Sequence, residues 1–213
     1  MTDAIRIRVQ DHVFFLTDRD VSTPFETMDH STGLAGVMES AALVAAGIDR
    51  GYVTVSTEPA DHRPPLDTAE QWAALASWED VAEFSLHVPH GALTVAPLEY
   101  TPAELPVLPT LSRHGGGYYR VRLQASGRDR HFDRVVEESG ERFHIIAWPG
   151  PPAGPLVIKA GSRCGYGLRL AQLQAPPPTD PLAPTPEQQA EAEHEALLRQ
   201  NLLAGAPDQA ESQ

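Results

Sequence analysis

Short segments with alternating apolar and polar residues, separated by proline and glycine, constrain the fold of this chain more than any other feature. The alternation is clear in residues 5–10 (IRIRVQ) and again in residues 83–88 (EFSLHV). A period of two places successive side chains on opposite faces of a strand. The chain holds 20 prolines and 16 glycines, which interrupt helices and favour turns. This pattern predicts a β-rich domain rather than a helical one.

Segments of this kind recur along most of the chain. They are residues 5–10, 12–18, 52–57, 83–88, 92–96, 118–125, 143–148 and 156–160. We therefore predict an all-β fold, an antiparallel β-sandwich of about eight short strands, with a closed barrel as the alternative. The turn residues Pro89 to Gly91 predict a hairpin between the strands on either side of them.

Residues 33–57 allow two interpretations. The alanines of residues 34–46 suit a helix closed by Gly47. The same residues could instead form the first strand of a hairpin, with its turn at residues 49–51. We favour the strand. Residues 69–81 are expected to hold a short helical turn.

The last part of the chain differs in composition from the rest. Residues 174–187 are proline-rich, which is typical of an extended linker. Residues 186–205 contain strong helix formers and a short leucine stripe, although an isolated helix of that length is marginal in water. We divide the chain into a β-sandwich domain, residues 1–171, and a Pro-rich linker with an acidic tail, helical or disordered, in residues 172–213.

The run HGGGYYRVRLQASGRDR, residues 114–130, contains three consecutive glycines. A phosphate-binding glycine loop follows a strand and opens a helix, whereas these glycines follow a loop and open a strand. Alternation predicts one buried face and one solvated face. The buried face would hold Tyr119, Val121, Leu123 and Ala125, and the solvated face Tyr118, Arg120, Arg122 and Gln124. With Trp148, which ends a later strand, Tyr118, Arg120 and Arg122 form our candidate ligand or partner surface.

The formal charge of −13 limits the possible partners. Nucleic acid repels an acidic surface, whereas opposite potentials speed encounter with a basic protein. The first residues lack a signal-peptide pattern, and no apolar run approaches the ~20 residues of a membrane span. We therefore expect a cytoplasmic protein with no direct nucleic-acid or membrane partner.

Candidate catalytic and metal-binding residues are few. His87 and His90 are three apart along a strand, so they point to opposite faces and cannot chelate together. The acids of residues 18–29 lack the ordered spacing of a calcium loop. Cys164 follows an arginine that could lower the thiol pKa, but the sequence names no base for it. We predict no metal, no cofactor and no enzymatic activity.

Residues 139–149 (SGERFHIIAWP) resemble the closing strand of the competence protein J family, where a glycine, an aromatic residue, an alternating strand and a tryptophan stand at similar spacing. The order of strands in residues 10–150 is also similar. The resemblance implies a small β-sandwich that inhibits a partner nuclease, and it carries over no catalytic residue.

Two functions remain open at this point. The first is a non-enzymatic protein-binding or inhibitory sandwich, with a basic partner such as a nuclease. The alternative is a sandwich that binds a small molecule or carbohydrate, with or without catalysis. The aromatic side chains available to contact such a ligand would be those of Tyr118, Tyr119, Trp148 and Tyr166. A concave pocket with convergent polar groups would favour this alternative.

Overall fold

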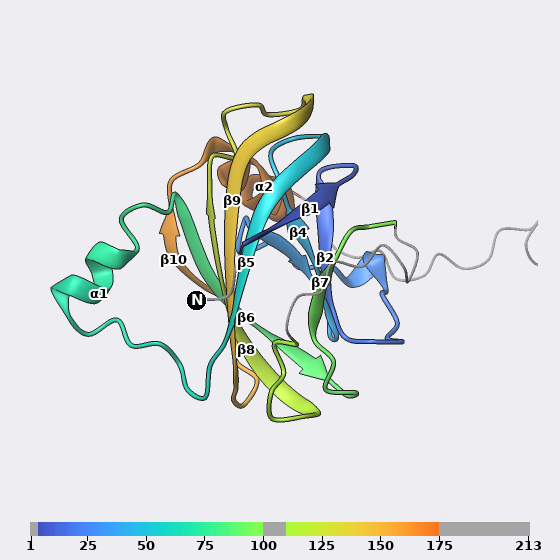
Figure 1. Ribbon diagram of the computed structural model, residues 1–213, viewed down its shortest axis with the longest axis vertical. Coiled ribbons are helices and arrows are strands. Elements are labelled where there is room, and N and C mark those ends of the chain that lie inside the picture. Colours follow the sequence, from blue (N-terminus) through green and yellow to red (C-terminus); the bar gives the residue numbers. More distant parts are fainter. Residues whose placement is uncertain (1–3, 100–109, 175–213) are drawn as a thin grey trace, which may run out of the picture. The chain divides into compact units, whose positions relative to one another are not determined.

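The structure is a computed structural model that describes residues 4–99 and 110–174, and it consists mainly of strands in two sheets (Figure 1). Its elements are β1 (Ile5–Val9), β2 (Val13–Thr17), η1 (Phe25–Thr27), β3 (Ala35–Val37), β4 (Ala41–Ala45), β5 (Arg50–Pro59), α1 (Ala69–Ala74), β6 (Asp80–Val88), β7 (Thr94–Ala96), β8 (Gly117–Ser126), β9 (Val135–Pro149), β10 (Leu156–Ala160) and α2 (Arg163–Gln174). The larger sheet has the order β1-β5-β9-β8-β6-β10 and the smaller one β3-β4-β2-β7. The mainly-β prediction is confirmed, with ten strands in the described residues instead of about eight.

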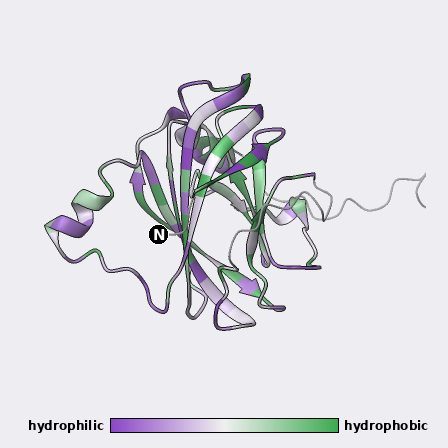
Figure 2. Cartoon of the chain, viewed as in Figure 1, coloured by the Kyte–Doolittle hydropathy of each residue, from purple (hydrophilic) through white to green (hydrophobic). Residues whose placement is uncertain are grey.

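Both sheets contribute to one apolar core. Ile7 of β1 and Phe84 of β6 come from the larger sheet, and Leu16 of β2 comes from the smaller one. The ring of Phe14 on β2 meets the ring of Phe143 on β9 edge to face, with the centroids 5.1 Å apart. Figure 2 shows hydrophilic and hydrophobic bands alternating along the strands of the larger sheet. The alternation in the sequence therefore marks the side chains that reach this core.

The strand prediction for residues 34–47 is confirmed, because β3 and β4 lie there. The two predicted hairpins are wrong. β4 pairs with β2 and β3, whereas β5 pairs with β1 and β9. β6 pairs with β8 and β10, whereas β7 pairs with β2. At both places the predicted turn carries the chain from one sheet to the other, since turn residues bend the chain without specifying which strand it pairs with next.

One strand pair departs from the antiparallel prediction. β5 and β9 run parallel, with Ser56 opposite His144 and Val55 opposite Phe143. The chain between them is a long crossover that includes β6 and β8. Parallel pairs need such crossovers, so no local sequence signal marks this pairing.

The predicted solvated face of β8 is largely buried, which corrects our expectation. Arg122 is 2% exposed and donates to the carbonyl oxygen of Pro64 at 2.7 Å. Arg120 donates to the carbonyl oxygen of Ala153 at 2.7 Å. Segments between strands thus fold back over this face, including the excursion that carries α1 to the left of the sheet in Figure 1. The opposite face is buried as predicted, with Tyr119, Val121, Leu123 and Ala125 in the core.

A helix that we did not predict follows β10. Two backbone amides at the start of α2, those of Arg163 and Cys164, donate to the carboxylate of Asp129 at 2.8 and 2.9 Å. These bonds satisfy amides that a helix start leaves free. Residues 1–174 form one compact unit, and α2 runs past residue 171, where we placed the domain boundary.

Of the predicted linker and tail, residues 172–213, the part from residue 175 onward lies outside the described residues. Within the part of the chain that is described, no helix is long and apolar enough to cross a membrane.

Candidate functional site

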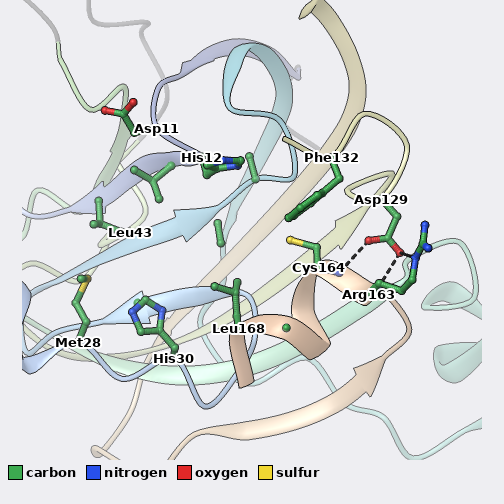
Figure 3. Close-up of a pocket in the computed structure, with 15 residues that line it drawn as sticks. Asp11, His12, Met28, His30, Leu43, Asp129, Phe132, Arg163, Cys164 and Leu168 are labelled. Atoms are coloured by element: carbon green, nitrogen blue, oxygen red, sulfur yellow. Dashed lines mark hydrogen bonds and ion pairs between the residues drawn. The ribbon is translucent and has the colours of Figure 1, made fainter. Parts of the chain in front are cut away.

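A cavity of about 650 Å³ lies between strands of the smaller sheet, the loop around residue 132 and α2 (Figure 3). Much of its wall is apolar, including Val13, Met28, Leu43, Ala45, Phe132 and Leu168. Small-molecule sites commonly occupy about 300–1,000 Å³ and are lined mainly by apolar side chains with a few polar groups. By size and lining, this cavity belongs to that class.

Small residues make room for the cavity. Ala45 is the last residue of β4 and Ala46 follows it, and both line the cavity with short side chains. Gly36 of β3 also lines it, and a Cβ there would lie 2.8 Å from the sulfur of Met28. On α2, a Cβ at Gly167 would meet no atom of the described residues within 4 Å. The glycines therefore permit close packing on one wall and leave open space on the other.

Asp129 pairs with groups at the start of α2. Asp129 accepts the two amides at the start of the helix, and its Oδ2 lies 3.8 Å from Nε of Arg163. The side chain of Arg163 is 90% exposed. Because a carboxylate of the chain already occupies the helix N-terminus, that end offers little attraction to an anionic ligand.

His12 stands at another edge of the cavity with both ring nitrogens engaged. Nδ1 donates to the carbonyl oxygen of Gly47 at 3.2 Å, and Nε2 lies 3.3 Å from Oδ1 of Asp133. The ring also packs against Phe132, with the centroids 6.0 Å apart. This bonding fixes the orientation of His12, with Nδ1 directed at the Gly47 carbonyl and Nε2 directed at Asp133.

Cys164 directs its sulfur into the cavity (Figure 3). Burial raises the pKa of the thiol, and the nearby charge of Arg128 offsets only part of that effect. The neutral thiol therefore dominates near pH 7, and a thiol is a poor nucleophile compared with its thiolate.

His30 contributes a neutral imidazole to the cavity wall. Burial lowers its pKa, although the charge of Asp29 acts in the opposite direction. Its backbone amide donates to Oε1 of Gln172 on α2 at 3.1 Å, which ties this loop to the helix. Its Nδ1 is buried and has no hydrogen-bond partner among the described residues.

Arg128 braces the elements around the cavity. It is fully buried and donates to Oδ2 of Asp80 at 2.7 Å, to Oγ of Ser162 at 3.0 Å and to the carbonyl oxygen of Ala45 at 3.2 Å. These partners belong to β6, to the residue before α2 and to β4. Burial alone would raise the pKa of Asp80, but the charge of Arg128 and hydrogen bonds from Ser162 outweigh it, so this pKa lies below its ordinary value.

The four predicted surface residues lie on the larger sheet, and none belongs to the cavity lining described above. Arg120 is opposite Trp148 in the β8–β9 ladder, and the guanidinium of Arg122 lies 5.9 Å from the Trp148 ring centroid. The exposed fractions are 45% for Tyr118, 9% for Arg120, 4% for Trp148 and 2% for Arg122. The structure thus brings these residues together, while only Tyr118 presents a large exposed side chain.

A polar arrangement that sequence reasoning missed lies on the neighbouring strands β5 and β9. Oγ of Ser56 is 2.8 Å from Nδ1 of His144, whose Nε2 is 3.5 Å from Oε2 of Glu58. A serine, a base and an orienting carboxylate can form a nucleophilic site. These side chains do not belong to the cavity lining described above, so a substrate position beside Ser56 does not follow from it.

Within the described ranges, no group of three or more His, Cys, Asp and Glu side chains is placed to hold a metal. Asp18, from the acidic loop considered for calcium, accepts the backbone amides of His90 and Ala92 at 2.6 and 2.8 Å. Its carboxylate therefore fixes a turn. His87 packs against Tyr118, with ring centroids 4.8 Å apart.

Comparison of the chain with protein-family models, curated proteins and solved structures finds no match. These comparisons do not bear on the resemblance to the competence protein J family. The functional inference therefore depends on the cavity and its polar groups.

Proposed function

We propose that this protein binds a small, predominantly apolar molecule in the cavity beside α2. The supporting observation is a volume of about 650 Å³ with a largely apolar wall. Each methylene group that such a ligand buries contributes roughly 0.8 kcal/mol. The walls themselves also lose contact with water, so both surfaces favour binding.

This proposal develops the small-molecule alternative from the sequence, with the site moved to a different set of residues. The ligand would contact Phe132, Leu43 and Leu168 rather than Tyr118 and Trp148. We also propose that the two sheets form a sandwich, which their shared core supports. In that arrangement α2 and the loop around residue 132 would close one side of the smaller sheet around the ligand.

A second candidate function is binding of a basic protein, such as a nuclease. It is supported by the formal charge of −13, since opposite potentials speed association, and by the resemblance to competence protein J. A pull-down from lysate at low and moderate salt tests it. Retention of a basic protein at low salt, released at higher salt, is the expected result, and retention of no protein at low salt would remove this candidate.

The cavity proposal is tested with N-phenyl-1-naphthylamine, a neutral apolar probe whose fluorescence rises in apolar surroundings. Gly167→Phe places a bulky ring on the cavity wall where the structure leaves space. The matched control is Gly154→Phe, because a Cβ at that loop position also meets no described atom within 4 Å and does not line the cavity. Both variants add the same side chain.

We expect saturable probe binding by the wild type and by Gly154→Phe. Gly167→Phe should bind the probe at least about tenfold more weakly, because the added ring occupies space that the probe would fill. A tenfold change corresponds to a loss of ~1.4 kcal/mol in binding free energy. Probe binding that is non-saturable in the wild type, or equal in the two variants, would contradict the proposal.

A further inference from the structure

We propose that the ligand carries a neutral carbonyl group whose oxygen accepts a hydrogen bond from Nε2 of His30. This inference rests on the proposed function and adds the chemical class of the ligand. It follows from the way His30 packs, from the tautomer that this packing favours, and from the pairing of other polar groups around the cavity.

One edge of the His30 ring is packed against β3. A Cβ built on Gly36 would lie 2.7 Å from Cε1 of His30 and 3.3 Å from Nδ1. The glycine thus lets this ring edge lie directly on the strand. His30 also lines the cavity, between Met28 and Leu168 in the view of Figure 3. Nε2 lies farther from that Cβ position than Cε1 or Nδ1 does, so we assign it to the ring edge that faces the ligand.

The buried Nδ1 determines where the proton of the neutral ring resides. This atom has no hydrogen-bond partner within the described residues. A neutral imidazole has one N–H donor and one bare acceptor nitrogen. Buried donors without acceptors are rarer in proteins than acceptors without donors, so the bare nitrogen is Nδ1 and the proton is on Nε2. Burial lowers the pKa of His30, which keeps the ring in this singly protonated form near neutral pH.

Two other polar groups that line the cavity, the side chains of His12 and Asp129, already have partners. His12 is held by Gly47 and Asp133, and Asp129 accepts amides of α2. The N–H of His30 is therefore an unused donor on a largely apolar wall, and it matches an acceptor on the ligand.

The lining also discriminates among acceptors. The carboxylates of Asp11 and Asp129 and the guanidinium of Arg163 line the cavity, so the lining carries a net negative charge that disfavours a carboxylate ligand. An alcohol could accept from His30, but its own O–H would lie unpaired in apolar surroundings, at a cost in free energy. A ketone, aldehyde or ester satisfies the donor without adding another one. A neutral carbonyl compound with an apolar chain is therefore the best match.

The test measures displacement of N-phenyl-1-naphthylamine by four ligands with chains of similar length: 2-nonanone, 2-nonanol, 1-nonene and nonanoate. The variant His30→Phe retains a ring and removes the N–H, and His30→Gln restores an N–H donor on a flexible side chain. The control is His62→Phe, at an exposed loop position. Probe binding by each variant shows whether its cavity is intact.

In the wild type we expect 2-nonanone to bind about three- to tenfold more tightly than 1-nonene, which corresponds to one net hydrogen bond. His30→Phe should abolish this ratio, which is measured as the affinity for the ketone divided by the affinity for the alkene in the same variant. His30→Gln should restore part of it, and His62→Phe should keep it fully. 2-Nonanol should bind less tightly than 2-nonanone.

Three outcomes would overturn the inference: equal binding of ketone and alkene by the wild type, a preference that survives in His30→Phe, or tightest binding of nonanoate. A nitrogen-15 NMR spectrum that places the imidazole proton of His30 on Nδ1 would also overturn it. Failure of the proposed function is distinguishable from all of these, because then neither the probe nor 1-nonene would bind to the wild type.

Discussion

Replacing Arg128 by methionine should destabilise the fold strongly, because this residue is fully buried and connects three elements. The variant Arg128→Met loses the bonds to Asp80, Ser162 and the Ala45 carbonyl. Asp80 would keep the backbone amides of Gly161 and Ser162 at 3.0 and 3.2 Å, but would have lost the countercharge it pairs with. Breaking a buried ion pair from one side costs about 3–5 kcal/mol, out of a total stability of about 5–15 kcal/mol.

Urea unfolding at pH 7 measures this loss. With a slope of about 2 kcal/mol per molar urea, the midpoint should fall by roughly 2 M. The double variant Arg128→Met with Asp80→Asn should recover part of that loss, because it removes the uncompensated carboxylate. Arg8→Met, at an exposed position on β1, should change stability by about 0.5 kcal/mol or less. A loss below ~1 kcal/mol for Arg128→Met, with no recovery in the double variant, would refute the bracing role of Arg128.

Three further predictions follow from buried groups and from the compact unit. Val121→Asp introduces a carboxylate into the core at a fully buried position and should cost several kcal/mol, so the soluble fraction on expression should fall sharply; soluble protein with a wild-type urea midpoint would contradict the placement of β8. Burial raises the pKa of Glu141, whose carboxylate accepts the amides of Gly47 and Ile48, so unfolded Glu141 releases its proton at a lower pH than the folded residue. The stability of the wild type relative to Glu141→Gln, measured from urea midpoints, should therefore fall as the pH rises from 4 to 7. A stability difference that stays constant over this range would argue against the raised pKa. Deleting residues 175–213 should lower the thermal midpoint of residues 1–174, which form one compact unit, by no more than ~4 °C; a larger drop would show that the deleted segment stabilises this unit.

The sequence predicted strands well where alternation reports burial. The inward side chains of β8 follow the predicted period. β10 also has the predicted bounds, Leu156–Ala160, although none of its residues is buried. Alternation does not report what covers the other face. Arg122 occupies a polar position in the pattern, yet Glu83 on β6 and the Pro64 carbonyl bury it. A charged residue has the same place in the pattern whether it meets water or an ion-pair partner.

Pairing and the cavity could not be predicted because they depend on residues far apart in the chain. The parallel pairing of β5 with β9 brings together Ser56 and His144, which are 88 residues apart. The start of α2 is fixed by Asp129, whose partner Arg163 lies 34 residues further along. Cys164 was singled out for its chemistry, but no pattern connected it with His30 or Phe132. The cavity exists only once these segments have packed.

The most direct test of the central claim is a pair of ¹H–¹⁵N NMR spectra of the full chain, with and without N-phenyl-1-naphthylamine. If the probe occupies the cavity, the largest shift changes should fall on the lining segments, around Leu43, Phe132 and Leu168. Amides near Tyr118 on the larger sheet should change little. Saturable shifts confined to the lining are the predicted result. Shifts centred on Tyr118 and Trp148 would place binding on the larger sheet and contradict the account.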